Sequence, residues 1–385
     1  MQQSRADRRA VRMWMVLAGL CACAVPAVAQ DEEGARLTAL SRAAVETQND
    51  ILVSGDAQAA LARRSNAAAF RGGIERNLAT VTNRRDAAAR SRVSYRAHQT
   101  TLRVTDTQVD GDRAVQDAVE HVILELAPVP GGPEQTEYEQ PHRFRFQRQG
   151  GEWTLVADDI LPPPEDPDSL RGPASTPRTM DAPPGYRPNP RLQERGGAPS
   201  ALLDGRPRFQ FASARPPYRA AVASYSPSAA VNYAYSYWSS YNSAYRAYDN
   251  DCTNFISQAV KAGGWPYDDV GERTASNTWY YGSFTFTTSY SWAGAHNFNL
   301  FFAQSGRGWA AQYFSDLLAG DLLQADFGPS PDGNISHSMV VTKKDTYGNI
   351  YLTYHSYNTR DRLLSDIQAS NPGTAWYGLL LKYSF

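Results

Sequence analysis

The chain has 385 residues, a formal net charge of -1 and three cysteines. This length exceeds that of a typical single domain and predicts two domains with a linker. The near-neutral charge excludes the strongly basic surface that nucleic-acid binding requires, so we expect no nucleic-acid partner.

Residues 1–29 have the pattern of an export signal. Four arginines precede an apolar run from Met13 to Val25, and Ala27-Val28-Ala29 is a small-x-small cleavage sequence. We expect the processed chain to begin at Gln30 with a net charge of -4. A lipoprotein signal cut before Cys23 is the less favoured alternative and would leave a lipid-anchored protein. No later stretch has the ~20 apolar residues of a membrane span, so we expect a periplasmic or extracellular location.

Residues 30–161 predict a small α+β domain. Apolar residues at helical spacing begin at Leu37, and an Ala-rich stretch from Ala57 to Ala89 continues the helical character. Strand-like alternation follows, with turn signals at Asp110-Gly111 and Gly150-Gly151. Helices followed by a curved meander resemble the cone-shaped fold of nuclear transport factor and SnoaL-like proteins. We find no catalytic pair here and expect three histidines to face solvent: His98, His121 and His142.

Residues 162–217 differ in composition from the rest of the chain. They contain 14 of the 24 prolines, mixed with Arg, Gly and Ser, and almost no aliphatic runs. Such a segment cannot bury enough apolar surface to offset its ordering entropy. We predict an extended, mobile linker.

Residues 218–385 predict a second globular domain, rich in aromatic side chains. Ser226-Pro227 is a good N-cap and first-turn pair. Aromatic and apolar residues follow at spacings of three and four as far as Tyr245, which indicates one face of a helix. Packing of this face against the core is favoured over a carbohydrate platform.

Cys252 is the one cysteine beyond the expected signal, so it has no intramolecular partner for a disulfide. Asp249-Asn250-Asp251 supplies capping residues, and the apolar pattern after them predicts a helix that ends at Gly263-Gly264. Cys252 then lies in the first turn, where backbone N–H groups and the helix dipole stabilise a thiolate. The same N–H groups can donate to a tetrahedral oxyanion. A thiol in this position is a candidate nucleophile.

A nucleophilic thiol needs a base, and the base needs a group that fixes its tautomer. His337 opens a short strand, and the next strand, Ile350 to Tyr354, ends at His355. Because the two runs predict a hairpin with its turn at Tyr347-Gly348-Asn349, we expect both imidazoles at the same end of it. His337 is then the base and His355 the orienting partner. Asn358 and Asp361 are alternatives for the orienting role.

The order of these features resembles that of papain-like cell-wall amidases of the NlpC and CHAP type. The string Asp251-Cys252-Thr253-Asn254-Phe255 with Ser257-Gln258, the pair Gly320-Asp321 before a strand and the pair His337-Ser338 are closer still to the bacterial putative amidase domain family. The resemblance spans about Tyr218 to Phe385. It implies an α+β fold in which a papain-like domain, with its N-terminal helices packed on an antiparallel sheet, follows the small cone-shaped domain.

The resemblance also implies a Cys-His-polar triad made of Cys252, His337 and His355. The glutamine that papain uses in its oxyanion hole has no counterpart, because Arg246 lies at about that upstream distance. Tyr248 is a candidate donor instead, and Asp251 and Asn254 are candidates for substrate positioning.

We therefore expect an exported cysteine amidase or peptidase that cleaves a peptide or peptidoglycan-like amide through an acyl-enzyme. We expect it to be a monomer without cofactor or metal. Zinc binding by Cys252, His337 and His355 is disfavoured because they are not in local ligand spacing. Two alternatives stay open: a non-catalytic wall- or peptide-binding adaptor with an aromatic groove, and an acyl transferase that uses the same triad.

Overall fold

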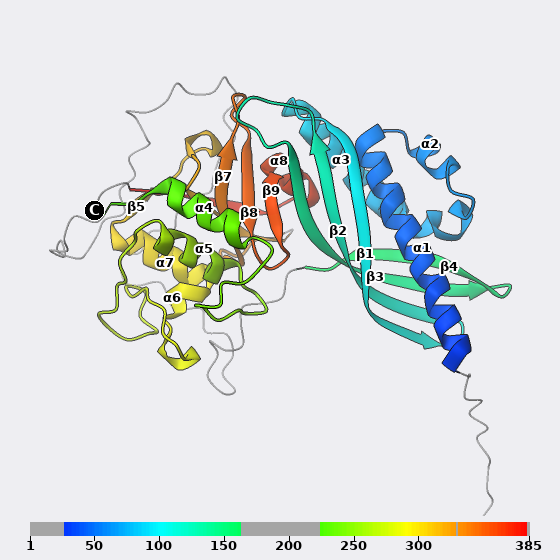
Figure 1. Ribbon diagram of the computed structural model, residues 1–385, viewed down its shortest axis with the longest axis horizontal. Coiled ribbons are helices and arrows are strands. Elements are labelled where there is room, and N and C mark those ends of the chain that lie inside the picture. The colour runs from blue at the N-terminus through cyan, green and yellow to red at the C-terminus, as the bar shows by residue number, and fades with distance from the viewer. Residues whose placement is uncertain (1–26, 163–223, 329, 383–385) are drawn as a thin grey trace, which may run out of the picture.

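The computed structural model describes residues 27–162, 224–328 and 330–382. These residues form a mixed α/β fold with one large antiparallel sheet (Figure 1). Its strands run in the order β1-β2-β3-β9-β8-β7-β6-β10-β5, and β4 also pairs with β3. Most of the expected export signal, and the expected linker beyond Pro162, lie outside the described residues.

Residues 27–162, hereafter the N-terminal unit, place helices before strands. These elements are α1 Ala27–Ser54, α2 Ala57–Ala62, α3 Ala67–Arg90, β1 Tyr95–Asp110, β2 Arg113–Leu126, β3 Gln135–Gln149 and β4 Glu152–Ile160. Residues 224–382, the C-terminal unit, mix the two types. The helical elements are α4 Pro227–Tyr237, α5 Cys252–Ala262, η2 Thr285–Thr287, α6 Tyr290–Ala293, α7 Ala295–Ser305, η3 Phe314–Asp316 and α8 Leu364–Ser370. The strands are β5 Gly308–Ala310, β6 Leu322–Asp326, β7 His337–Lys344, β8 Ile350–Tyr354, β9 Thr359–Leu363 and β10 Ala375–Leu381.

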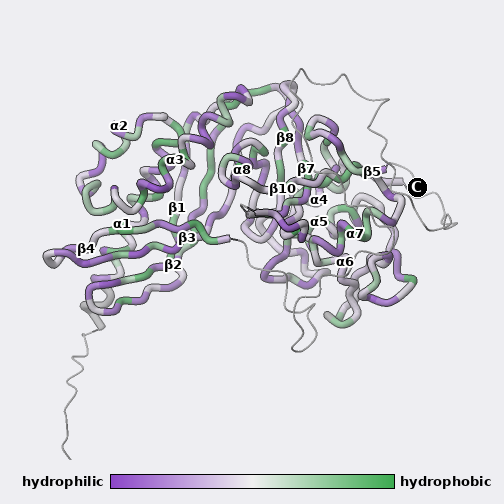
Figure 2. Tube along the Cα trace, turned by 180° about the vertical axis from the view of Figure 1, so that it is seen from behind, coloured by the Kyte–Doolittle hydropathy of each residue, from purple (hydrophilic) through white to green (hydrophobic). Residues whose placement is uncertain are grey.

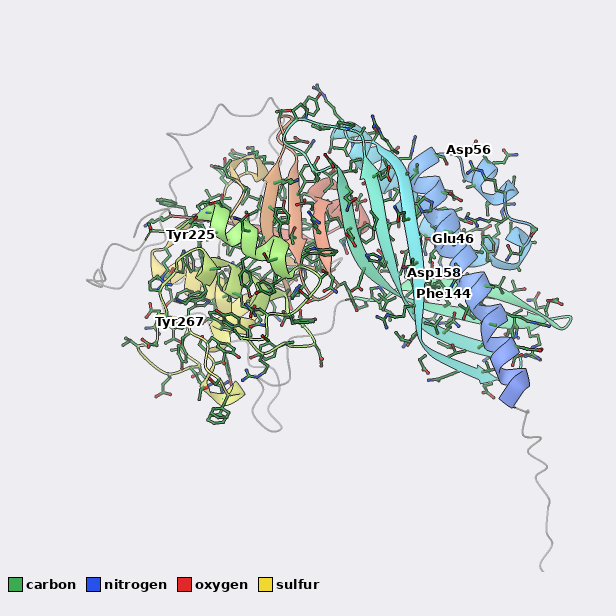
Figure 3. All side chains as sticks on the ribbon, viewed as in Figure 1. Glu46, Asp56, Phe144, Asp158, Tyr225 and Tyr267 are labelled. Atoms are coloured by element: carbon green, nitrogen blue, oxygen red, sulfur yellow. The ribbon has the colours of Figure 1, made fainter. Side chains whose placement is uncertain are left out.

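The core of the N-terminal unit lies between its helices and one face of its strands. Every second residue of β2 is buried, as expected for a strand with one face on a core. Hydrophilic and hydrophobic segments alternate along these strands (Figure 2). Phe144 of β3 and Asp158 of β4 are cross-strand partners and lie behind α1 in Figure 3. Phe144 packs with Leu37 of α1 and Phe70 of α3.

The predicted turns of the N-terminal and C-terminal hairpins are confirmed. Asp110 pairs with Arg113 across the β1–β2 turn, where Gly111 has a φ of 58°. The β7–β8 turn contains Gly348 with a φ of 84°. Glycine occupies such left-handed positions without the steric cost that a Cβ brings.

The C-terminal unit buries both faces of its part of the sheet. On one face α4, α5 and α7 pack against alternate strand residues, among them Leu322, Val340 and Leu379. On the other face α8 packs against the intervening residues, among them Leu323, Met339 and Leu380. Figure 1 shows α4 and α5 in front of β7 and β8, with α8 behind the sheet.

The sheet runs without a break from one unit into the other. Strand β3 of the N-terminal unit pairs with β9 of the C-terminal unit at Glu137↔Arg360 and Tyr138↔Thr359. Helix α3 packs against α8, and Tyr138 shares a hydrophobic cluster with Tyr351 and Leu363. The two expected domains are therefore fused through a common sheet and a common core.

One prediction for the N-terminal histidines is wrong. His142 is buried, and its ring donates from Nδ1 to Asp158 at 2.6 Å and from Nε2 to Glu120 at 3.2 Å. Burial alone would lower the pKa of His142, but the two carboxylates outweigh it and raise the pKa to about 10. His98 is also partly buried and bonded to Asp50, and only His121 keeps about a third of its side chain exposed.

No helix in the described parts of the chain is long and apolar enough to cross a membrane.

Candidate active site

Cys252 is the first residue of α5, as the sequence predicted. It is 1 % exposed, is not disulfide-bonded, and its Sγ lies 3.6 Å from Thr253 Oγ1. Asp251 occupies the N-cap position but makes no side-chain capping hydrogen bond. Cys252 therefore lies at the positive end of the α5 dipole, in the turn whose backbone N–H groups begin the helix.

The carboxylate of Asp251 is engaged by three other groups. Its Oδ1 accepts from the backbone N–H of Tyr248 at 3.0 Å and from Asn254 Nδ2 at 2.8 Å. Its Oδ2 accepts from His355 Nδ1 at 2.7 Å. A buried carboxylate with three donors is well satisfied, so Asp251 forms a rigid support for the imidazole of His355.

The imidazole of His355 is buried and held on every side. Its Nε2 donates to the backbone oxygen of Tyr237 at 2.7 Å, and its ring stacks on Phe255 of α5 at 4.1 Å. Both ring nitrogens therefore lie within hydrogen-bond distance of oxygen acceptors, the Asp251 carboxylate and the Tyr237 carbonyl. This arrangement pairs His355 with Asp251, the residue directly before Cys252 in the chain.

His337 lies in a different environment. It is buried, its Nδ1 has no hydrogen-bond partner among the described residues, and its ring packs between Phe327 at 5.4 Å and Tyr354 at 4.9 Å. Burial without a compensating charge lowers the pKa of His337 to about 3. The ring is therefore neutral at physiological pH.

The prediction that His355 orients His337 is wrong. The hairpin does bring both residues to the same end, because Val340 pairs with Thr353 and the register continues towards Ser356. This register places His337 opposite Ser356, one position beyond His355. Because side chains on a strand alternate between the two faces of the sheet, His337 and His355 point to opposite faces. His337 lies with Tyr354 on the face that α8 covers, whereas His355 lies against α5.

The side chains that follow Cys252 and His337 in the chain are nevertheless hydrogen-bonded to each other. Thr253 Oγ1 lies 2.9 Å from Ser338 Oγ, which also accepts from Gln324 Nε2 at 2.9 Å. The strand that His337 opens is therefore fixed against the nucleophile helix through its second residue.

The two alternative orienting residues lie elsewhere. Asp361 is buried and accepts hydrogen bonds from Tyr235 Oη at 2.8 Å and from Thr342 Oγ1 at 2.7 Å, so its carboxylate is committed to α4 and β7. Asn358 accepts the backbone N–H of Glu139 with its main-chain oxygen. Neither residue has a hydrogen bond to an imidazole in the described parts of the chain.

The candidates for oxyanion binding and substrate positioning have two kinds of role. Asn254 is fully buried and tied to Arg246, Asp251 and Trp292, so it holds the turn before α5. Tyr248 accepts from Arg246 Nη1 at 2.8 Å and keeps its own hydroxyl proton, because burial raises its pKa. The amide N–H groups of Asn254 already donate to the Arg246 oxygen and to Asp251, so among the named candidates we take the Tyr248 hydroxyl as the donor.

Two features of the site were missed from the sequence. The Asp251–His355 bond was missed because Asp251 was considered only as a neighbour of the thiol. The Asn250–Ser356 bond beside it was not expected at all.

Three tryptophans that lie between Cys252 and strand β7 in the sequence are fully buried core residues rather than groove residues: Trp265, Trp279 and Trp292. No group of three or more potential metal-ligating side chains is present within residues 27–162, 224–328 and 330–382.

Comparison with known proteins finds a family model and curated relatives that match part of this chain. Residues 224–379 match the model of a family described as a putative amidase domain. The uncharacterized protein YhbB of Bacillus subtilis (strain 168) is 34 % identical over 139 residues, which are 35 % of this chain and 43 % of that protein. The uncharacterized protein YjcM of the same organism is 30 % identical over 146 residues, 36 % of this chain and 32 % of that protein.

The chain thus spans less than half the length of each of these relatives. No solved structure matches it. The stretch that matches contains Cys252, His337 and His355 and excludes the N-terminal unit. Residues 224–379 are therefore similar to an amidase-domain family, which points to amide hydrolysis in general.

Proposed function

We propose that the C-terminal unit hydrolyses an amide bond with Cys252 as nucleophile and the Asp251–His355 pair as its acid-base partner. The observation that carries the proposal is the 2.7 Å bond from His355 Nδ1 to Asp251, the residue directly before a thiol at the first position of a helix. Nucleophilic catalysis uses a thiol together with a base that another group orients, and Asp251 supplies this orientation for His355 next to the thiol in the chain.

The chemistry would follow an acyl-enzyme route. The thiolate attacks the amide carbonyl, and first-turn N–H groups with the Tyr248 hydroxyl receive the developing negative charge. His355 turns its Nε2–H from the Tyr237 oxygen to the leaving nitrogen, the C–N bond breaks, and the amine departs with that proton. Water then attacks the thioester, gives one proton to His355 and releases the carboxylic acid and the thiolate.

His337, which the sequence predicted to be the base, is the second candidate for that role. The observation in its favour is its buried Nδ1, which has no hydrogen-bond partner within the part of the chain that the structure describes, because an unsatisfied buried nitrogen is costly and often has a functional reason. In that case His337 would act from the end of β7 after a rotation of its side chain, and Asp251–His355 would support the nucleophile turn.

The substrate and the compartment are further parts of the proposal. The expected export signal and the amidase-domain match favour a peptide or peptidoglycan-like amide outside the cytoplasm. Cys252 is 1 % exposed, so a substrate must reach it through a local opening. The same burial favours the second candidate function, a non-catalytic domain that binds such peptides while its thiol stays inert.

The test uses the full chain, a panel of N-acyl p-nitroanilides and purified muropeptides, with products identified by mass spectrometry. We expect hydrolysis by the wild type and none by Cys252→Ala. His355→Gln should lower kcat by about 10²–10⁴, the usual range for loss of acid-base catalysis. His98→Gln, in the N-terminal unit, is the matched control and should keep full activity.

Three outcomes would refute or redirect the proposal. Hydrolysis retained in Cys252→Ala would refute cysteine catalysis. Activity that survives in His355→Gln but is lost in His337→Gln would transfer the base role to His337. Peptide binding that is equal in all variants, without any product, would favour the non-catalytic domain.

A further inference from the structure

The segment that carries His355 is a short turn between β8 and β9, residues 355–358, which we call the His355 turn. It is held from two sides, and neither the sequence nor the comparisons assign a role to Asn250, Ser356 or Glu139, three of the residues in these contacts. One side is the segment just before Cys252, and the other is a strand of the N-terminal unit.

On the nucleophile side, two side-chain hydrogen bonds lie next to each other. His355 donates to Asp251, and Ser356 Oγ donates to Asn250 Oδ1 at 2.5 Å. Consecutive residues of one segment therefore bind consecutive residues of the other. Asn250 is buried, so its amide oxygen would be left unsatisfied if Ser356 moved away.

Ser356 adopts a backbone conformation that is rare for its residue type. Its φ is 90°, in the region that glycine occupies readily and residues with a Cβ seldom do. Such a conformation costs free energy and persists only where the surroundings impose it. The strained residue is the one directly after the imidazole, so relaxation of its backbone would turn His355 away from Asp251.

On the other side, the N-terminal unit fixes the end of the turn. The backbone N–H of Glu139 in β3 donates to the main-chain oxygen of Asn358 at 2.9 Å, and Tyr138 pairs with Thr359. Tyr138 is itself locked, because Arg84 donates to its hydroxyl at 2.7 Å and Arg362 lies over its ring at 4.3 Å.

We infer that Asn250 and Ser356 are positioning residues that hold the strained His355 turn against the nucleophile segment, with β3 of the N-terminal unit as the fixed second support. This inference rests on the proposed function, because it gives the Asp251–His355 pair its geometry. It also gives the N-terminal unit a task within the candidate site.

The test compares four variants of the full chain: Ser356→Ala, which keeps the strain and removes the bond, Ser356→Gly, which removes both, Asn250→Ala, and the double variant Asn250→Ala/Ser356→Ala. We expect each of the three single variants to lower kcat about tenfold or more with KM within twofold of wild type. The kcat of the double variant should not fall below that of the less active of Ser356→Ala and Asn250→Ala, since both single substitutions remove the same bond. Ser365→Ala is the control and should match wild type. Ser365 lies in α8, and the substitution removes its hydrogen bond to Ser91 at the end of α3.

A readout without substrate separates this inference from the proposed function. The His355 Nδ1 proton should give a downfield proton NMR signal, identified by its loss in His355→Gln. We expect that signal to weaken or shift upfield in Ser356→Ala and Asn250→Ala and to stay unchanged in Ser365→Ala. Ser356→Gly should melt at or above the wild-type temperature and still lose activity, which a merely structural role would not produce.

The inference is overturned if the signal and kcat are unchanged in Ser356→Ala and Asn250→Ala. A wild type inactive on every amide tested would count against the proposed function, while the NMR comparison would still decide whether the turn positions His355.

Discussion

Arg84 of α3 donates from Nε to Asp366 of α8 at 2.6 Å, across 282 positions of the sequence. Arg362 of β9 donates to the same carboxylate at 2.8 Å, and all three side chains are buried. This ionic cluster therefore lies at the junction between the N-terminal and C-terminal units and joins one helix from each. Burial alone would raise the pKa of Asp366, but the two guanidinium groups outweigh it and lower the pKa to about 2.

Loss of one partner from this cluster should destabilise the whole chain. Arg84→Met leaves a buried carboxylate with a single counter-ion, and a broken buried pair typically costs about 3–5 kcal/mol. Urea unfolding followed by tryptophan fluorescence measures the change. Arg143→Met, which breaks an exposed pair with Asp117, should change stability little. Equal effects of the two substitutions would show that the cluster does not hold the junction.

The stability of the N-terminal unit should fall at alkaline pH because of His142. Its folded-state pKa is raised to about 10 from an ordinary value of 6.5, so the folded chain keeps a proton that the unfolded chain loses. The stabilisation is complete below about pH 6.5 and is lost as the pH rises through about 10. We expect urea unfolding to show a loss of about 2–3 kcal/mol between pH 6.5 and 8.5.

The variant His142→Gln should remove most of that pH dependence, with lower stability at pH 6.5. His121→Gln, at a more exposed position, serves as its control. A wild type whose stability is constant from pH 6.5 to 8.5 would contradict a protonated His142.

His337 should make the protein less stable at acidic pH, whereas His142 makes it less stable at alkaline pH. Its pKa is lowered to about 3 by burial, so below about pH 6.5 the unfolded chain binds a proton that the folded chain excludes. Stability is therefore lost as the pH falls from about 6.5 towards 3, with no effect above this window. His337→Phe suits the aromatic neighbours Phe327 and Tyr354 and should reduce the loss between pH 7.5 and 4.5 by about 2–3 kcal/mol. An unchanged acid transition in this variant would argue that the ring is solvated.

Two adjacent glycines of α3 should respond oppositely to alanine. A Cβ on Gly72 would meet no atom within 4 Å, so Gly72→Ala should stabilise the helix by about 0.5–1 kcal/mol. A Cβ on Gly73 would lie 2.5 Å from Leu155 Cγ and 2.8 Å from its backbone oxygen, so Gly73→Ala should destabilise by about 1–3 kcal/mol. Thermal unfolding of the two variants side by side measures the difference. Shifts of the same sign would contradict the close contact between α3 and β4.

Local signals were enough to predict the elements that carry the site. The Asp251-Cys252 start and Gly263-Gly264 end of α5, the Ser226-Pro227 start of α4 and the β7–β8 turn are all confirmed. Each depends on capping or turn preferences of a few neighbouring residues, which tertiary packing did not override.

The wrong predictions concern features that depend on which face of a strand a side chain occupies or on the pairing of strands far apart in the sequence. His337 and His355 were expected to meet because they lie at one end of a hairpin, but their offset of one position sends them to opposite faces. His142 has the same strand parity as Phe144 and Phe146, which could have indicated an inward side chain. The β3–β9 pairing joins residues more than 200 positions apart, and no local pattern predicts it.

The continuous sheet has a consequence for truncated forms of this protein that lack the N-terminal unit. A fragment that starts at Ser224 would lack β3, the partner of β9. The backbone donors and acceptors of β9 would then be exposed and could pair with another extended chain. The buried ring of Tyr351 would lose its cover from Tyr138 at the same time. Such a fragment should self-associate through this exposed edge strand, so the C-terminal unit is best studied with the N-terminal unit attached.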